Sequence, residues 1–296
     1  MKKYAILADS TSDLSAELLK EYDIDYVKMG YVVDEKEYPV LLEWSEVSPS
    51  EYYNMMRAGK KIRTTQVSKE TFTEKFNYYL EKDMDILYLG CSSALSGSVN
   101  FGTIMARDIM EKNKDAKIIC IDTLISSLGQ GYLVLTAAKL RAEGKTIDEV
   151  AEYIESIKLT VNQFGTVDSM EYLKRAGRIK ASKAFFGNLF GIKPIIISDK
   201  IGQNYAVKKV KGTYNSKLEI AKCIAEAVIN PEEQTLYISH ADSIDEANVL
   251  RDEILKLVQF KDVYTNYIGP IVGASVGPGT LIAYCVGKEV TIEGKE

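Results

Sequence analysis

The 296-residue sequence contains one histidine, four cysteines and no long apolar run. Cys91, Cys120, Cys223 and Cys285 are scattered and form no C-x-x-C pair, which is typical of reduced thiols in a cytoplasmic protein. No stretch approaches the roughly 18 apolar residues that a membrane-spanning helix needs. Asp9 follows the N-terminus too closely to leave room for the apolar core of a signal peptide. These absences predict a soluble, cytoplasmic protein.

The presence of only one histidine also limits the catalytic and metal-binding sites that the chain can form. His240 is the single histidine, and neither G-x-S-x-G nor G-x-x-x-x-G-K-[ST] occurs, so a Ser-His-Asp triad, a zinc site and a nucleoside triphosphate site have little support. His240 follows an apolar run and is interpreted as a partly buried structural residue. The net charge of −5 argues against a broad nucleic-acid surface, and 46% hydrophobic residues suffice for a substantial core.

The first half of the chain alternates short apolar runs with amphipathic stretches. Strands are expected over 4–8, 25–31, 86–89 and 117–121, and helices over 15–22, from 49, 69–81, 99–112, 128–143 and 146–158. The capping boxes Ser48-Pro-Ser-Glu51 and Thr146-Ile-Asp-Glu149 mark two of the helix starts. This alternation predicts a doubly wound, parallel α/β sheet with helices on both faces.

The rhythm changes after about residue 160. Strands are expected over 164–167, 235–239 and 282–286, and a hairpin joins 195–197 to 205–210. Helices are expected over 215–228 and after a third capping box, Ser243-Ile-Asp-Glu246. We therefore predict an α/β domain over 1–160 and a mixed α+β domain over 161–296, with an α/β fold class for the whole chain.

Hydroxyl-rich segments follow or border the strands of the first half. They are Asp9-Ser-Thr-Ser-Asp13, Arg63-Thr-Thr-Gln-Val-Ser68, Ser92-Ser-Ala-Leu-Ser-Gly-Ser98, and Asp122-Thr123 with Ser126-Ser127. Each of them alone is an ordinary helix cap. Because parallel strands end at one edge of their sheet, several such loops converge there and form a polar wall with little charge. A strand that ends in small hydroxyl residues and opens a helix suits an anion, and without a lysine a carboxylate fits best.

Three carboxylates at the same strand ends leave a second interpretation open. Asp9, Asp13 and Asp122 could hold Mg²⁺ with a phosphate, as in a phosphotransferase or hydrolase acting on a small metabolite. Carboxylates at these positions more often cap helices. We expect neither a metal nor a cofactor.

Two segments of the second half stand out. Ile268-Gly-Pro-Ile-Val-Gly-Ala-Ser-Val-Gly-Pro-Gly279 is either a tight crossover turn or a rigid loop beside a ligand tunnel. Leu173 to Lys180 with Lys183 is the main basic run, either a solvated helix face or a docking surface for an acidic partner or a phosphate. The apolar residues that follow, Phe185, Phe186, Leu189, Phe190 and Ile192, are interpreted as core.

Taken together, these segments resemble the DegV family of bacterial fatty-acid-binding proteins. The motifs that carry the resemblance run in the family's order along the whole chain: Leu7-Ala-Asp-Ser-Thr-Ser-Asp13, Thr64-Thr-Gln-Val-Ser68, Ser92-Ser-Ala-Leu-Ser-Gly-Ser98, Asp122-Thr with Gly129-Gln-Gly131, Tyr172-Leu-Lys-Arg-Ala-Gly-Arg-Ile179, Gly191-Ile-Lys-Pro-Ile195 and Gly273-Ala-Ser-Val-Gly-Pro-Gly279. No single motif is decisive, but seven of them in order are specific.

The resemblance implies a two-domain, non-catalytic carrier that holds one long-chain fatty acid, such as palmitate or oleate, in an internal tunnel. It implies that Thr64 and Ser96 bind the carboxylate, with Thr65 and Ser93 as further candidates. Some members present the acid to a fatty acid kinase, which phosphorylates it for phospholipid synthesis. A module that regulates a partner in response to an acyl ligand is a further possibility.

The sequence departs from the family pattern at two positions. Ser275 stands where many members have a histidine near the carboxylate, and it can donate a hydrogen bond without adding positive charge. Lys211 stands in place of an arginine and lacks its bidentate fork. Arg178 lies in the region that resembles the family's surface for a partner or a phosphate. Carboxylate binding is therefore expected to be retained, and presentation to a kinase is less firmly implied.

Overall fold

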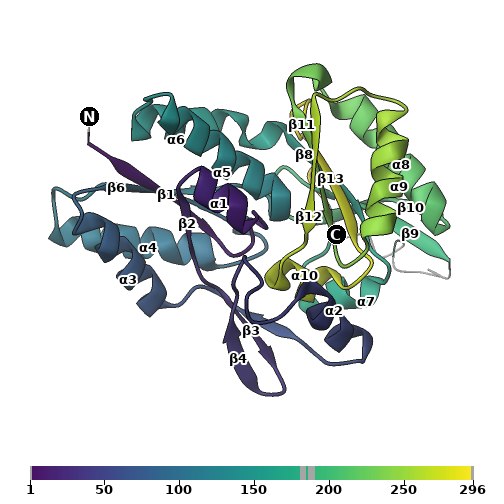
Figure 1. Ribbon diagram of the computed structural model, residues 1–296, viewed down its shortest axis with the longest axis horizontal. Helices are drawn as coiled ribbons and strands as arrows, with labels where there is room; N and C mark the ends of the chain where they lie inside the picture. The colour runs from purple at the N-terminus through teal and green to yellow at the C-terminus, as the bar shows by residue number, and fades with distance from the viewer. Residues whose placement is uncertain (1, 181–184, 186–190, 295–296) are drawn as a thin grey trace. The chain divides into compact units, whose positions relative to one another are not determined.

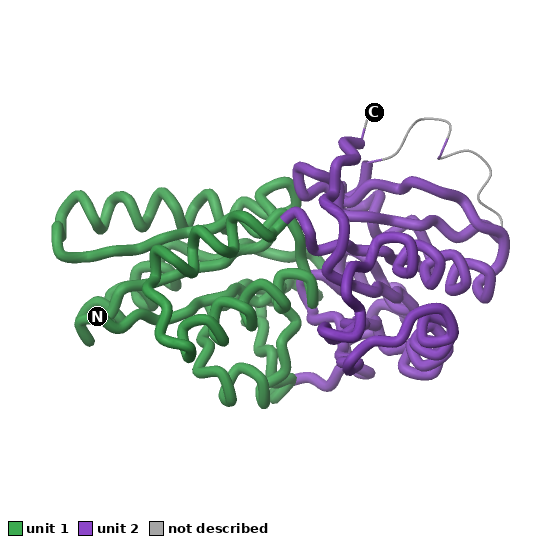
Figure 2. The backbone as a smooth tube through the Cα atoms, turned by 90° about the horizontal axis from the view of Figure 1, so that it is seen from above, with its two compact units in different colours: residues 1–46, 62–158 green, residues 47–61, 159–296 purple. Residues whose placement is uncertain are grey.

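The computed structural model describes residues 2–180, 185 and 191–294 (Figure 1). Two compact units can be distinguished, one of residues 1–46 and 62–158 and the other of residues 47–61 and 159–296 (Figure 2). The division into domains near residue 160 stays a prediction. Residues 47–61, which that prediction included in the first domain, lie with the second unit.

The first unit contains the predicted parallel sheet. Its strands, in the spatial order β2-β1-β6-β7, are β1 (Tyr4–Asp9), β2 (Ile24–Val27), β6 (Asp85–Gly90) and β7 (Ile118–Asp122), and all neighbours are parallel. Every residue of β1 and β6 is buried, as expected for strands covered on both faces. Helices α3 and α4 contact each other on one face and α5 and α6 on the other (Figure 1). The doubly wound sheet is confirmed.

The helices of this unit begin and end close to their predicted positions. They are α1 (Ala16–Glu21), α3 (Lys69–Leu80), α4 (Ser98–Lys112), α5 (Ser127–Ala142) and α6 (Ile147–Ile157). Ser68 caps α3 through the N–H of Thr71, and Thr146 and Glu149 form the expected capping box. Gly144 ends the α5 segment with φ of 85°, a left-handed conformation that glycine adopts without strain.

The single strand expected over 25–31 was wrong, because it is two strands in two sheets. β2 ends at Val27, and β3 (Gly30–Val33) joins β4 (Lys36–Pro39) and β5 (Arg63–Thr65) in a small antiparallel sheet of order β4-β3-β5. The Ser10 hydroxyl separates them, because it donates to the Val27 carbonyl at 3.4 Å and accepts the Met29 N–H at 3.0 Å. Ser10, which is distant from β2 and β3 in the sequence, thus lies at the point where the pairing of β2 with β1 ends.

The second unit is built on a mixed, six-stranded sheet, which confirms the α+β expectation. Its order is β10-β9-β8-β13-β11-β12, and only β11 and β12 are parallel among the described pairs. The strands are β8 (Val161–Thr166), β9 (Ile192–Ser198), β10 (Asn204–Lys211), β11 (Thr235–His240), β12 (Asp262–Tyr267) and β13 (Leu281–Val286). The helices are α2 (Pro49–Arg57), α7 (Met170–Ala176), α8 (Thr213–Ala227), α9 (Ile244–Leu255) and α10 (Pro270–Val276), with 3-10 turns at η1 (Lys158–Thr160) and η3 (Pro231–Glu233). Helices α8 and α9 pack together over a buried core that includes Ile195, Ile220, Leu236 and Leu250.

Two expectations about this unit need correction. The glycine-rich segment 268–279 is not a turn or a loop throughout, because Pro270 begins the short helix α10. The third capping box is absent: the Ser243 hydroxyl donates to the Ala241 carbonyl at 3.2 Å, and Glu246 forms an ion pair with the buried Lys217. Of the apolar run after the basic segment, Phe185 is buried as predicted, and Ile192 is half-buried at the start of β9. Lys183, Phe186, Leu189 and Phe190 lie outside the described residues.

Candidate functional site

The hydroxyl-rich loops of the first unit meet at the carboxyl edge of the parallel sheet. The loop after β7 is joined to the loop after β6, because Thr123 N–H donates to the Gly90 carbonyl at 3.2 Å and Ser92 N–H to the Ile125 carbonyl at 3.0 Å. Ser127 reaches the loop after β1, where its hydroxyl donates to Asp13 at 2.6 Å. The predicted convergence of the strand-end loops is therefore observed.

Asp9 lies fully buried at the centre of this edge. One carboxylate oxygen accepts hydrogen bonds from the Thr11 N–H and hydroxyl and from the Gln130 amide, and the other accepts from the Tyr88 hydroxyl at 3.0 Å and the Cys91 N–H at 2.9 Å. Burial, and then the Asp9 carboxylate, raises the pKa of the Tyr88 hydroxyl well above its usual value. Asp9 thus ties β1 to β6 and to α5.

The other two carboxylates also hold the loops in place. Asp122 accepts the N–H groups of Ser93, at 3.2 Å, and Leu124, at 3.0 Å. Asp13 has a left-handed φ of 51° and accepts the Ser127 hydroxyl. Over residues 2–180, 185 and 191–294, no group of three or more His, Cys, Asp or Glu side chains is placed to hold a metal ion. In the contacts that the structure shows, these carboxylates accept hydrogen bonds that hold the strand-end loops in place.

The loops that carry Thr64 and Ser96 are joined by hydrogen bonds. Ser98 Oγ accepts the Val67 N–H at 3.2 Å and the Ser96 hydroxyl at 3.1 Å, and Ser98 N–H donates to Ser96 Oγ at 3.3 Å. Gln66 packs against Gly97 so closely that a Cβ at position 97 would lie 2.6 Å from its Oε1 atom. The structure therefore brings these two motifs together.

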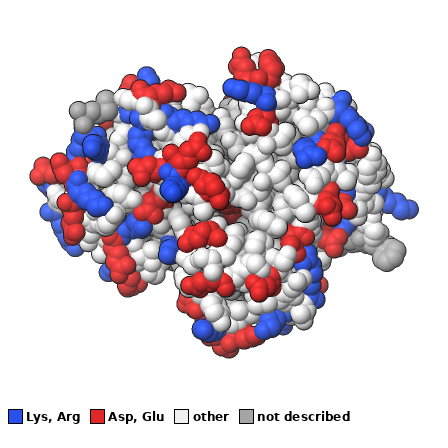
Figure 3. Space-filling model, viewed as in Figure 1, with Lys and Arg blue, Asp and Glu red and all other residues white. Residues whose placement is uncertain are grey.

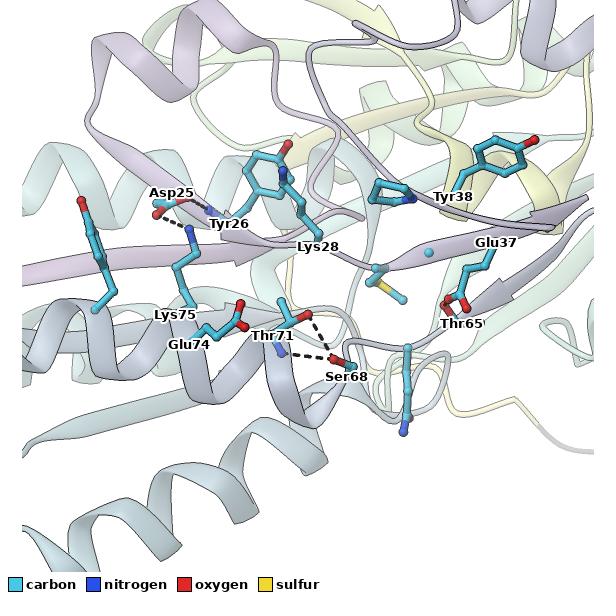
Figure 4. A pocket seen from close by; sticks show the side chains of 15 residues that line it. Asp25, Tyr26, Lys28, Glu37, Tyr38, Thr65, Ser68, Thr71, Glu74 and Lys75 are labelled. Atoms are coloured by element: carbon cyan, nitrogen blue, oxygen red, sulfur yellow. Dashed lines mark hydrogen bonds and ion pairs between the residues drawn. The ribbon is translucent and has the colours of Figure 1, made fainter.

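The side chains of Thr64 and Thr65 point to opposite faces of the small sheet. The Thr65 hydroxyl donates to Glu37 at 2.7 Å, and the two side chains lie side by side in Figure 4. Since successive strand residues point to opposite faces, Thr64 is directed away from Glu37, and it is exposed. Ser96 is half-buried just before α4, whose N-cap, Gly97, has no capping side chain. An exposed hydroxyl, a half-buried hydroxyl and the positive end of a 15-residue helix are suited to a carboxylate.

The remaining candidates for the head group lie in different units. Ser93 is in the same loop as Ser96, is half-buried, and donates its N–H to Asp122. Ser275 is half-buried in α10 of the second unit.

Arg178 and Lys211, grouped in the sequence as one partner-facing pair, lie near opposite ends of β10. The Arg178 carbonyl accepts from the Asn204 side chain at 3.2 Å at the start of the strand, and Lys211 is its last residue. Seven residues of extended strand span about 23 Å, so the two cations are not neighbours. Both side chains are exposed.

Hollows lined by a single unit occur in both units. One of about 810 Å³ in the first unit lies between α3 and the small sheet, where Lys75 pairs with Asp25 at 2.7 Å and Ser68 contacts Thr71 (Figure 4). An apolar one in the second unit encloses only about 20 Å³, and its lining includes Val167, Leu173, Ile196, Val276 and Ile282. This volume has room for about one water molecule.

His240 is a structural residue, as its sequence position indicated. It is buried, its ring centre lies 4.5 Å from that of Tyr267, and its Nδ1 atom accepts the Ser243 N–H at 3.2 Å. Burial lowers its pKa from 6.5 to about 4. The imidazole is therefore neutral at physiological pH, with its proton on Nε2.

Acidification is expected to destabilise the second unit through His240. Between pH 6.5 and its native pKa of about 4, the unfolded chain binds a proton at His240 that the native state does not. The free energy of unfolding is therefore expected to fall by about 1–2 kcal/mol from pH 6.5 to pH 5. Urea unfolding of the wild type and of His240→Asn, which keeps an acceptor but does not titrate, measures this effect as a difference. Equal pH dependence of the two proteins would contradict the assignment.

The geometry defines a two-unit α/β protein with an anion-suited edge of serine and threonine hydroxyls on its parallel sheet. The chain belongs to the DegV family: the model of the family described as "Uncharacterised protein, DegV family" matches residues 3–287. A DegV domain-containing protein of Clostridium perfringens, CPE0026, is 37% identical over 97% of this chain and 98% of its own length. The part of the chain that the structure describes has no helix long and apolar enough to cross a membrane.

Solved structures give the same family. A structure described as fatty acid binding of a DegV family protein from Thermus thermophilus is 27% identical and covers 97% of this chain and 100% of its own, with a TM-score of 0.85. A DegV lipid binding protein from Thermotoga maritima is 26% identical over 97% of this chain and 99% of its own, with a TM-score of 0.82. The fold of the chain is therefore that of the DegV family.

Proposed function

We propose that this protein binds one long-chain fatty acid and holds its carboxylate with the hydroxyls of Thr64 and Ser96. The observation that carries the proposal is the junction of their two loops through Ser98, which accepts from Val67, three residues after Thr64, and from Ser96, just before α4. Ser93, in the same unit, is proposed as a further donor, and Ser275, in the second unit, stays a prediction from the sequence. Thr65, whose hydroxyl contacts Glu37, is a weaker candidate.

The free energy gained by burying an acyl chain is large enough for a binding site that carries little charge. Each buried CH₂ group contributes about 0.8 kcal/mol, so the chain supplies most of the affinity. Two or three hydroxyl donors then satisfy the carboxylate and fix its orientation, with hydrogen bonds to a charged group worth about 1.5–3 kcal/mol each. An arginine at the head group is not required.

The relatives support the same ligand class. The Thermus thermophilus structure is described as fatty acid binding, and a Thermotoga maritima structure, 25% identical with a TM-score of 0.80, is described as revealing a fatty acid binding function. Both cover 97% of this chain. A long-chain acid such as palmitate or oleate is therefore the first ligand to test.

We propose further that the protein is a non-catalytic, cytoplasmic carrier in fatty acid metabolism, a compartment that suits its four free cysteines. Presentation of the acid to a fatty acid kinase would use the basic surface of the second unit. Every charged residue from 174 to 211 is Lys or Arg except Asp199, which is buried, although the whole chain has a net charge of −5. On the face drawn in Figure 3, acidic and basic side chains are interspersed.

Mass spectrometry of the purified protein tests the proposal directly. Native spectra are expected to show one long-chain acid per chain, and organic extraction after denaturation is expected to release and identify it. Delipidated protein is expected to bind added palmitate or oleate with one-to-one stoichiometry. A protein that carries no lipid and also refuses both acids would overturn the proposal.

A further inference from the structure

We infer that Ser98 is a positioning residue of the carboxylate site, which fixes the Ser96 hydroxyl and holds the Thr64 loop against it. The inference rests on the proposed fatty acid binding. Ser98 is the first residue of α4 and is fully buried. It is thus separated from solvent, while Ser96 two residues earlier is half-buried and Thr64 is exposed.

The hydrogen bonds of Ser98 connect both loops through one oxygen. Its Oγ atom accepts from the Val67 backbone at 3.2 Å and from the Ser96 hydroxyl at 3.1 Å. A hydroxyl oxygen has two lone pairs, so these two donors occupy its accepting capacity. Ser98 therefore joins the two loops, and because it is fully buried we leave the carboxylate to the more exposed hydroxyls of Ser96 and Thr64.

A second contact lies beside the same loops. The Gln66 side chain rests on Gly97, where an added Cβ would lie 2.6 Å from Oε1, so a larger residue at position 97 would displace the end of that side chain. Gln66 follows Thr64 by two residues, and Gly97 follows Ser96 directly. This contact joins the same two segments as Ser98 does.

Ser98 also prepares the Ser96 hydroxyl for an acceptor. The Ser96 hydroxyl donates to Ser98 Oγ at 3.1 Å, and the Ser98 N–H donates to the Ser96 oxygen at 3.3 Å. A carboxylate offers only acceptors, so on binding it accepts the hydrogen bond of the Ser96 hydroxyl while the backbone N–H of Ser98 keeps the Ser96 oxygen in place. A site organised in this way before binding loses less conformational entropy, which favours the acid over neutral lipids.

Ser98→Ala tests the inference through head-group discrimination. The variant keeps the fold and the backbone N–H but loses the acceptor for Val67 and Ser96. The dissociation constant for palmitic acid is expected to rise about tenfold, the size of the lost hydrogen bond from the Val67 N–H that holds the Thr64 loop, while that for hexadecanol changes less than twofold. Gly97→Ala, which forces Gln66 away with all hydroxyls intact, is expected to reduce the same acid-to-alcohol preference.

Ser68→Ala is the matched control, because Ser68 caps α3 from the Thr64 loop through the Thr71 N–H at 3.1 Å but does not join the two loops. It is expected to lower stability without changing the preference for the acid. An unchanged acid-to-alcohol preference in folded Ser98→Ala would overturn the inference while leaving fatty acid binding intact. A wild-type protein that binds neither lipid would instead overturn the proposed function itself.

Discussion

Replacing both Thr64 and Ser96 with alanine is expected to weaken fatty acid binding by about 100-fold or more. Each hydroxyl is proposed to donate to the ligand's carboxylate, and a hydrogen bond to a charged group contributes about 1.5–3 kcal/mol, or roughly tenfold to a hundredfold in affinity. Titration of delipidated protein with palmitate, followed by calorimetry, measures the change. The fold is expected to persist, because Thr64 is exposed and Ser96 is half-buried in a turn.

Thr65→Ala is the matched control for this double variant. Thr65 is the chain neighbour of Thr64 and has the same side chain, but its hydroxyl donates to Glu37 on the other face of the small sheet. Its removal is expected to change palmitate affinity less than threefold. Equal affinities of the double variant, the control and the wild type would refute the assignment of the carboxylate to Thr64 and Ser96.

Local signals predicted much of the first unit because they depend on neighbours in the chain. The capping box at Thr146 needs only Glu149 three residues later, and the structure contains both of its hydrogen bonds. The meeting of the strand-end loops also followed from the sequence, since strands joined by helices are parallel and end at one edge. Neither inference required a tertiary contact to be known.

The errors arose where a distant residue decides the structure. The break between β2 and β3 depends on Ser10, which bonds to the backbone at Val27 and Met29. The capping box predicted at Ser243 does not form, because Glu246 forms an ion pair with the buried Lys217 of α8. In both places a tertiary partner overrides a local preference.

The candidate site shows the same division. Thr64 and Ser96 were predicted from their motifs, and the meeting of the strand-end loops was expected from the sheet. The role of Ser98 and the packing of Gln66 on Gly97 depend on the exact approach of two loops. Arg178 and Lys211 were grouped because of the resemblance to the family, but the length of β10 separates them.

The assignment of residues 47–61 to the second unit rests on two buried tyrosines of α2. The Tyr52 hydroxyl donates to the Pro270 carbonyl and the Tyr53 hydroxyl to the Ile268 carbonyl, each at 2.7 Å. Tyr53 also packs on Gly273, where a Cβ would lie 2.5 Å from the tyrosine hydroxyl oxygen. These contacts hold α2 against α10, the helix that carries Ser275, although α2 lies between segments of the first unit in the sequence.

Tyr53→Ala is therefore expected to lower the free energy of unfolding of the second unit by about 3–5 kcal/mol, the range for deleting a large aromatic side chain from a core. Tyr53→Phe keeps the ring and removes only the hydrogen bond to Ile268, so about 1 kcal/mol is expected. Urea unfolding followed by circular dichroism measures both. The fluorescence of Trp44, the single tryptophan, follows the first unit in the same samples.

Tyr78→Ala is the control, because it removes a side chain of the same size from an exposed position. Tyr78 is 49% exposed on α3, so its removal is expected to lower the free energy of unfolding by less than about 0.5 kcal/mol. If Tyr53→Ala were no more destabilising than Tyr78→Ala, the α2 helix would not be anchored in the second unit. The expected result is a large loss of unfolding free energy in Tyr53→Ala and a small loss in Tyr53→Phe. It would show that packing of the ring against α10, more than the hydrogen bond, holds α2 in the second unit.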